Sequence, residues 1–204
     1  MPKISDERRA ERREQILAAA RRCFAEFGYE GATVARLEQS TGLSRGAIFN
    51  YFGSKEDLFV ELAVQDSSRL SELWVNEGLR AVVEEVMELD PAWLGVYLEL
   101  IRRVRTDSDF KRRVEERQQE VVPVNRARIV AAQESGEFRA DLEPKEIGVF
   151  VNLVLNGIAL QRASGEEPPP AALVLRLLED AIGGPSMKSP ARRRTRAGTP
   201  APAR

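Results

Sequence analysis

The stretch TVARLEQSTGLSRGAIFNYFGSK, residues 33–55, decides the fold. Thr33 and Ser44 each stand at the start of a short segment of helical periodicity, where a hydroxyl accepts a hydrogen bond from a first-turn N–H. Gly42, between them, suits the left-handed position that ends a helix. Ser54 begins a third helix, with an acidic residue three positions later as in a capping box. Two short helices joined by a glycine-containing turn are typical of a DNA-binding helix-turn-helix.

The second of these helices, residues 45–52, separates a buried side from a DNA-facing side. Ile48 and Phe52 are four residues apart, so they share one face, which we expect to be buried. On the other face, an arginine at the helix start can reach guanine O6 and N7, and an exposed phenylalanine can contact thymine methyl groups. Glycine beside the arginine lets the helix approach the groove floor.

Hydroxyl, amide and amine groups near the helix starts, together with the backbone N–H groups there, suit phosphates. The residues that we predict to contact DNA are Thr33, Ser44, Arg45, Gly46, Phe49, Asn50, Tyr51 and Lys55. Core packing is the alternative for Phe49 and Tyr51, and a solvated surface charge is the alternative for Arg45.

Helical periodicity extends over almost the whole chain. Apolar residues recur at spacings of three and four, and alternating runs of β-formers are absent, which predicts an all-α protein. With glycine and proline as breaks, we expect about nine helices, near residues 6–27, 34–41, 45–52, 55–76, 79–89, 91–106, 108–135, 144–163 and 171–182. Pro123 should kink the seventh.

Charge divides the chain into three parts. Residues 1–53, the predicted helix-turn-helix domain, hold nine Lys/Arg and seven Asp/Glu, whereas residues 54–182, the helical body, hold sixteen and twenty-five. Residues 183–204 hold six basic residues and no acidic one, and we expect a disordered basic tail. Arginines in that tail either add non-specific phosphate affinity or only solubilise the chain. A positive front end on an acidic body suits a protein that presents its N-terminal face to a polyanion.

Several kinds of chemistry are excluded by the residue types. The chain has no histidine and a single cysteine, Cys23, so histidine-based catalysis and the usual Cys/His zinc sites are ruled out. We expect no metal, no cofactor and no enzymatic activity. The opening residues are charged, and the longest apolar stretch, 147–160, is too short to cross a bilayer. We therefore expect a cytoplasmic protein without membrane association.

The run from RRCFAEFGY at residue 21 to SKEDLF at residue 59 resembles the N-terminal signature of the tetracycline-repressor (TetR) family of transcription regulators. The nine-helix layout fits that family over residues 6–182. The resemblance implies a homodimeric repressor whose two heads bind half-sites of a palindromic operator in double-stranded DNA. It also implies that residues 54–182 bind a small-molecule effector that releases the DNA. The dimer seam would involve 147–160 and 173–182, as a four-helix bundle.

Within the family, the segments SRGAIF (44–49) and NRARI (125–129) are similar to an actinobacterial subgroup whose effector is a tricarboxylate. This likeness makes Arg126 and Arg128 candidate carboxylate ligands, since guanidinium binds carboxylate through two parallel hydrogen bonds. Asn152 and Asn156 stand where the resemblance would lead us to expect acidic residues, so the sequence departs from the pattern needed for metal-assisted tricarboxylate binding. The effector residues that we predict are Trp74, Trp93, Tyr97, Arg102, Arg126, Arg128 and Asn152. Core packing and solvated charge are the alternatives for these aromatic and basic residues.

Two other classes of function remain as alternatives to a DNA-binding regulator. One is a helical protein-interaction module that does not bind DNA. The other is an enzyme that uses carboxylates of the acidic body without histidine. Its candidate pairs, Glu84–Glu85 and Glu115–Glu116, are adjacent in sequence, so the two side chains of each pair diverge around the helix.

Overall fold

The computed structural model describes residues 6–119 and 121–186. This part of the chain forms ten α-helices and one isolated antiparallel bridge between Phe138 and Gly183. The helices are α1 (Asp6–Gly31), α2 (Val34–Thr41), α3 (Arg45–Phe52), α4 (Lys55–Asn76), α5 (Leu79–Glu88), α6 (Pro91–Thr106), α7 (Ser108–Gln118), α8 (Val121–Glu134), α9 (Pro144–Ala163) and α10 (Ala171–Ile182). The prediction of an all-α chain is confirmed. Most of the predicted basic tail lies outside the described residues.

The seventh predicted helix is in fact two helices. Instead of one kinked helix over 108–135, α7 ends at Gln118 and α8 begins at Val121. Pro123 lies in the first turn of α8, where its missing N–H needs no partner. A helix running through this position would bring the proline ring against the carbonyl four residues earlier, so the chain starts a new helix here.

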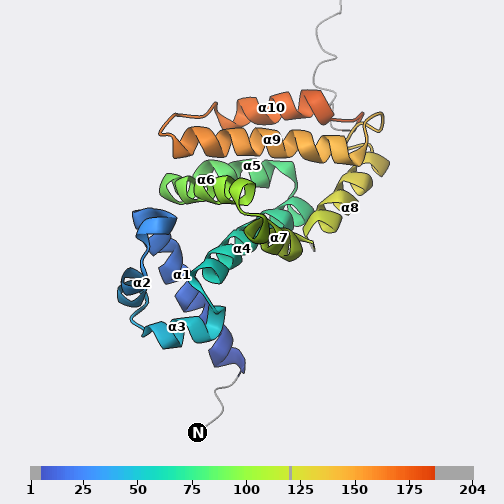
Figure 1. Cartoon of the computed structure of the whole chain (residues 1–204). Coiled ribbons are helices and arrows are strands. Elements are labelled where there is room, and N and C mark those ends of the chain that lie inside the picture. Colours follow the sequence, from blue (N-terminus) through green and yellow to red (C-terminus); the bar gives the residue numbers. More distant parts are fainter. Residues whose placement is uncertain (1–5, 120, 187–204) are drawn as a thin grey trace, which may run out of the picture.

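The helices lie in two groups that α4 joins (Figure 1). Helices α1, α2 and α3 gather at one end, and α9 and α10 run side by side at the opposite end. Helix α6 lies between the two groups and packs against both α1 and α9. The helix-turn-helix is therefore connected to the body by α4 along the chain and by α6 through packing.

The described residues form two hydrophobic cores. The first contains Phe24 of α1, Ile48 of α3 and Phe59 of α4, together with Trp93 of α6 and Phe110 of α7. The second joins the C-terminal end of α4 to α5, α8, α9 and α10. The first core therefore joins the helix-turn-helix to parts of α4, α6 and α7. The boundary at 53 stays a prediction about function.

A glycine interrupts α1 close to the predicted end of the first helix. Gly28 has φ 70° and ψ 173°, a conformation that is open to glycine and strained for other residues. A Cβ at this position would lie 2.9 Å from Oε1 of Glu99 on α6. The break lets the chain turn toward α2 while α6 stays close. None of the described helices is long and apolar enough to cross a membrane.

Candidate nucleic-acid interface

The caps of the helix-turn-helix form as the sequence predicts. Thr33 Oγ1 accepts a hydrogen bond from the N–H of Arg36 at 3.4 Å, and Ser44 Oγ accepts one from Ala47 at 3.4 Å. Gly42 adopts φ 68° and donates its N–H to the Glu38 carbonyl oxygen at 2.9 Å. These local bonds fix where α2 ends and where α3 begins.

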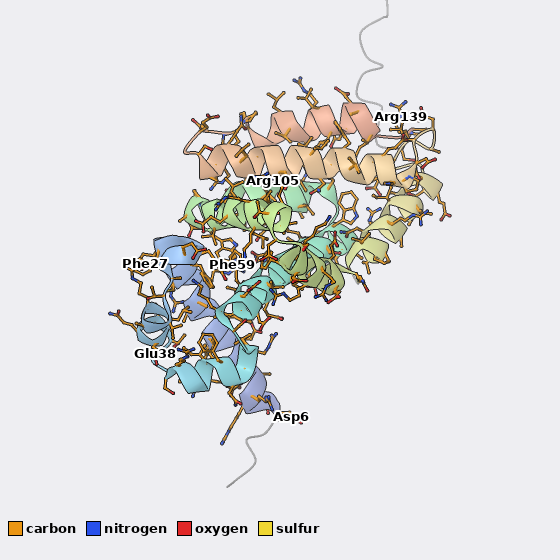
Figure 2. The ribbon with its side chains drawn as sticks, viewed as in Figure 1. Asp6, Phe27, Glu38, Phe59, Arg105 and Arg139 are labelled. Carbon is orange, nitrogen blue, oxygen red and sulfur yellow. The ribbon has the colours of Figure 1, made fainter. Side chains whose placement is uncertain are left out.

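Glu38 is a residue of this unit that the sequence analysis missed. Its Oε1 atom accepts a hydrogen bond from the N–H of Arg45 at 2.6 Å, across the turn between α2 and α3. Glu38 is labelled in Figure 2. A carboxylate at a helix N-terminus satisfies an otherwise unpaired donor and interacts favourably with the helix dipole. The only signal in the sequence is a glutamate seven residues before Arg45, and that spacing has meaning only once the turn is known.

The two sides of α3 differ in burial as predicted. Ile48 is fully buried and Phe52 is 7% exposed. The predicted DNA contacts that are exposed are Thr33, Ser44, Arg45, Gly46 and Asn50. Phe49 and Tyr51 are half-buried and pack against the first core, so each combines a core contact with partial exposure. Side-chain exposure alone is therefore compatible with both DNA contact and core packing for these two aromatic residues.

Lys55 is turned toward the protein rather than outward. Its ammonium donates a hydrogen bond to the Tyr29 carbonyl oxygen at 2.7 Å and lies 4.3 Å from the centroid of the Tyr29 ring. Burial lowers the pKa of Lys55 below its ordinary value. In this structure Lys55 ties the start of α4 to the end of α1, so a phosphate contact by Lys55 would have to share or replace that bond.

Charged side chains connect the helix-turn-helix domain (α1, α2 and α3, called the head below) and the start of α4 to α6 and α7. Glu99 Oε2 accepts a hydrogen bond from the N–H of Tyr29 at 2.8 Å. Glu56 in the first turn of α4 pairs with Arg103 on α6 at 3.2 Å and also with Arg113 on α7. Because these contacts join elements far apart in sequence, the orientation of the head depends on the position of α6.

A third connection reaches α1 through Asp66. This carboxylate on α4 accepts hydrogen bonds from Trp93 Nε1 at 2.6 Å and from Arg21 Nη1 at 3.1 Å. The Arg21 guanidinium also lies 4.4 Å from the centroid of the Trp93 ring. Trp93 is 5% exposed and belongs to the first core. Its role here is to hold α1, α4 and α6 together.

The other predicted effector residues lie in different places. Tyr97 packs against the first core, where burial raises its pKa. Arg102 lines an open groove of about 740 Å³ at the junction of α1, α4 and α6. Arg126 is exposed on α8, and Asn152 is exposed on α9, where it accepts a 3.3 Å hydrogen bond from Asn156. The structure thus does not bring all seven residues into one pocket.

Trp74, which belongs to the second core, does lie beside Arg128. The Arg128 guanidinium is 5.8 Å from the centroid of the Trp74 ring and donates to both carboxylate oxygens of Glu137, at 2.9 and 3.1 Å. Trp74 Nε1 is buried without a hydrogen-bond partner. Arg128 and Glu137 line a groove of about 340 Å³ whose other charged residues are Arg80, Glu77 and Glu179. This is the place where two of the predicted effector residues meet.

A capped helix-turn-helix rigidly joined to a helical body defines a DNA-binding transcriptional regulator. Residues 16–62 match the family of bacterial regulatory proteins called the tetR family, and residues 75–184 match the C-terminal domain of BetI-type transcriptional repressors. The chain belongs to the TetR family, as its sequence predicts. It is a DNA-binding regulator of transcription with repressor relatives.

The relatives support the narrower resemblance as well. The chain is 41% identical to the HTH-type transcriptional repressor Rv1474c of Mycobacterium tuberculosis, over 89% of this chain and 98% of that protein. It is 40% identical to the HTH-type transcriptional repressor AcnR of Corynebacterium glutamicum, over 83% and 92% of the two chains. The predicted likeness to an actinobacterial subgroup of the family is thus confirmed.

Solved structures share the fold at lower identity. Salmonella enterica GusR superposes with a TM-score of 0.69 at 22% identity, covering 89% of this chain and 99% of that one. A TetR-family regulator from Rhodococcus sp. gives a TM-score of 0.70 at 20% identity, covering 86% and 100%. These likenesses concern the fold alone.

Proposed function

We propose that this protein is a homodimeric repressor that binds a palindromic operator through α3 and is released by a small acidic effector. The observation that carries the DNA-binding part is the exposure of Arg45, Gly46 and Asn50 on α3, a helix whose Ile48 is buried in the first core. Helices of this kind place their N-terminal residues against base edges in the major groove. The body, residues 54–182, supplies the dimer seam and the effector site.

Within this interface we assign different tasks to different residues. Arg45, at the first position of α3, reads a base, since arginine binds guanine O6 and N7 through two hydrogen bonds. Thr33, Ser44, Asn50 and Tyr51 contact phosphates beside the groove, together with the backbone N–H groups at the two helix starts. Phe49 contacts thymine methyl groups with the exposed part of its ring. Lys55 reaches a phosphate by exchanging its bond to Tyr29.

The dimer seam is supported by apolar side chains on the outer faces of α9 and α10. Those left exposed are Val149, Phe150, Leu153, Leu160, Leu173 and Leu177. Leu153 is 65% exposed and Leu177 is 56% exposed, which is high for leucine side chains on two adjacent helices. A patch of this kind favours burial against a second copy of the same helix pair, which would complete a four-helix bundle.

For the effector site we propose the groove at Arg128. Glu137 now holds this guanidinium through two hydrogen bonds, as the carboxylate of a ligand would. An acidic small molecule would replace Glu137 and bring α8 closer to or further from α4, which carries the head. Trp74, whose ring lies beside Arg128 and whose buried N–H is unpaired, is the second residue that we assign to this site.

The two alternative functions have less support. Each carboxylate of the candidate enzyme pairs has its own ion-pair partner. Glu84 pairs with Arg80 and Glu85 with Arg69, whereas Glu115 pairs with Lys111 and Glu116 with Arg112. A module that has lost DNA binding would not need the exposed face of α3. We propose a regulator without enzymatic activity, acting in the cytoplasm where the DNA is.

Selection of bound sites from a random double-stranded DNA pool tests the DNA-binding assignment. The wild-type chain should enrich a palindrome, and Arg45→Ala should relax preference at one base pair per half-site, with a loss of about 1–3 kcal/mol at that position. Asn50→Ala should weaken all selected sites evenly. If Arg45→Ala also weakens every sequence evenly, Arg45 binds a phosphate and our assignment is wrong.

Titration of the protein–DNA complex with small carboxylic acids tests the effector site. A set of mono-, di- and tricarboxylates should contain compounds that release the labelled operator duplex from the wild-type chain. Arg128→Ala should keep operator binding but lose the response, and Arg126→Ala, an exposed neighbour on α8, should retain it. Equal loss in both variants would exclude a site centred on Arg128.

A further inference from the structure

The first two turns of α1 carry an arginine stripe that the helix-turn-helix does not account for. Its members are Arg8, Arg9, Arg12 and Arg13, whose spacing of one, three and four residues places them on one face of the helix. Glu7, Glu11 and Glu14 share the other face by the same rule. The two signs of charge are thus separated around the helix, although their numbers nearly balance.

The arginine stripe is a continuation of the buried face of α1. From Arg9 and Arg13 the same face runs on to Ile16, Ala20 and Phe24, at successive spacings of four, three, four and four. These three apolar residues are each at most 1% exposed in the first core. Arginines therefore occupy the positions where the helix projects past the core, and Arg9 and Arg13 lie beside aromatic residues of α3.

Contacts with α3 confirm this direction. The Arg9 guanidinium lies 5.8 Å from the centroid of the Tyr51 ring, and that of Arg13 lies 5.2 Å from the Phe52 ring. Both aromatics belong to the last turn of α3. Arg13 is also paired with Glu61 on α4, so its charge is used within the protein. Arg9 and Arg12 are exposed.

The position of these two residues fits one kind of ligand. Figure 1 shows the start of α1 beside α3, at the end of the molecule opposite α9 and α10. Base contacts come from the first turn of a recognition helix, whereas Arg9 lies at its last turn, where the DNA backbone passes the groove. A guanidinium stacked on an aromatic ring keeps its N–H edge available for oxygen atoms of a phosphate.

We propose that Arg9, held on the Tyr51 ring, and Arg12 on the next turn bind backbone phosphates that flank the groove occupied by α3. The proposal rests on the DNA-binding role of α3 and extends the interface to a helix outside the helix-turn-helix. These contacts add affinity and orient the head, but they do not read the base sequence.

Salt dependence of operator binding tests the proposal. The probe is a fluorescein-labelled duplex that carries the site selected by the wild-type full chain, titrated from about 50 to 300 mM KCl. Each phosphate contact contributes about 0.9 to the slope of log affinity against log salt concentration. Arg9→Ala in a dimer removes two contacts, so the slope should become shallower by about two and affinity should fall most at low salt. Arg12→Ala should act in the same direction.

Two controls isolate the contact. Arg112→Ala removes an arginine whose side chain is 62% exposed on α7, and it should leave both slope and affinity unchanged. The selected base preference should be the same for Arg9→Ala as for the wild type, in contrast to Arg45→Ala. In a double-mutant cycle, Tyr51→Leu should reduce the effect of Arg9→Ala, whereas Tyr51→Phe, which keeps the ring, should not.

The outcomes separate this proposal from the function on which it rests. If the wild-type chain selects no DNA, the regulator assignment fails and the phosphate contacts fail with it. If the wild type binds and folded Arg9→Ala and Arg12→Ala show the same slope and affinity as the wild type, the α1 contacts are overturned while the role of α3 stands. A change in base preference for Arg9→Ala would also overturn the proposal, since it would make Arg9 a base reader.

Discussion

Gly46 is the residue at which folding and DNA binding can be separated most cleanly. It is exposed in the first turn of α3, and a Cβ added there would meet no other atom within 4 Å. Alanine favours a helix over glycine by up to about 1 kcal/mol, so Gly46→Ala should leave the melting temperature unchanged or raise it. Operator affinity should fall, because the methyl group separates α3 from the groove floor.

Gly95→Ala is the matched control for this prediction. Gly95 is also within a helix, α6, and an added Cβ there likewise meets nothing within 4 Å. It should raise stability to a similar extent without changing operator affinity. If Gly46→Ala binds the operator as tightly as Gly95→Ala does, α3 does not approach the groove closely at this residue.

Gly28 presents the opposite case, in which the side chain is excluded by the fold itself. Its φ of 70° with ψ 173° disfavours any L-residue, and a Cβ would contact Glu99 Oε1 at 2.9 Å. Gly28→Ala should lower the free energy of unfolding by about 1–3 kcal/mol, measured by urea denaturation. Gly42→Asn, at φ 68° in the left-handed region that asparagine tolerates, should cost clearly less. Equal losses would show that backbone strain at Gly28 is relieved by movement of the chain.

Hydrogen bonds between residues of the same helical turn could be predicted from the sequence, whereas those between residues of different elements could not. The caps at Thr33 and Ser44 depend on N–H groups three residues away, so their spacing is visible in the chain. Lys55 donates a hydrogen bond to Tyr29, and the Arg45 N–H donates one to Glu38. The spacing of the two residues in each pair does not follow from helical periodicity. Phe49 is half-buried against the first core, a contact that a helical wheel does not show.

Among the elements, α6 carries most of the contact between head and body. It packs on α9 with one side and on α1 with the other, and Glu99 on it accepts the Tyr29 N–H. Glu99→Ala should leave that donor unpaired, which costs about 1–3 kcal/mol, and should speed hydrogen exchange of the Tyr29 amide. Glu99→Gln keeps an acceptor and should preserve protection. Unchanged exchange in Glu99→Ala would show that water replaces the carboxylate and that α6 does not hold the head through this bond.

Element boundaries were predictable where a single residue forces them. Asp90 caps α6 by accepting from the Ala92 N–H at 2.9 Å, with Pro91 at the first helical position, as the sequence predicts. At Pro123 the sequence predicts a kink instead of a helix start, because helical periodicity continues through the segment. A proline destabilises a helix less in the first turn than in the interior, and Pro123 lies in the first turn of α8.

For the whole molecule, the exposed apolar face of α9 and α10 predicts that stability and DNA binding depend on dimer formation. Leu153→Glu and Leu177→Glu should each place a charge in the seam and shift the sedimentation coefficient from dimer to monomer. A monomer presents one half-site reader, so operator affinity should fall steeply.

Val122→Glu is the control for the dimer prediction. Val122 on α8 is 65% exposed, the same fraction as Leu153. Its replacement should leave the dimer and operator binding intact. If Leu153→Glu remains a dimer that binds DNA normally, the seam lies elsewhere on the surface.

The shared first core was beyond what the sequence could predict. Helical periodicity shows which face of α4 or α6 is apolar, but it does not show which partner covers that face. The sequence therefore leaves both a ligand pocket and core packing open for Trp93 and Tyr97, and both lie at the first core. Trp74 and Arg128 meet because α4 crosses α8, and that crossing depends on tertiary packing alone.

That shared core also limits how this regulator can be rebuilt. Phe24 and Ile48 share the first core with Phe59, Trp93 and Phe110 of the body, so a graft of residues 1–53 onto another regulator would expose apolar surface at the joint. A functional chimaera needs the exchanged segment to carry α4 and the facing side of α6 with it. Operator specificity can therefore change through substitutions at the outward residues of α3 alone. Exchange of an entire head between related regulators also requires matching changes on the parts of α4 and α6 that contact it.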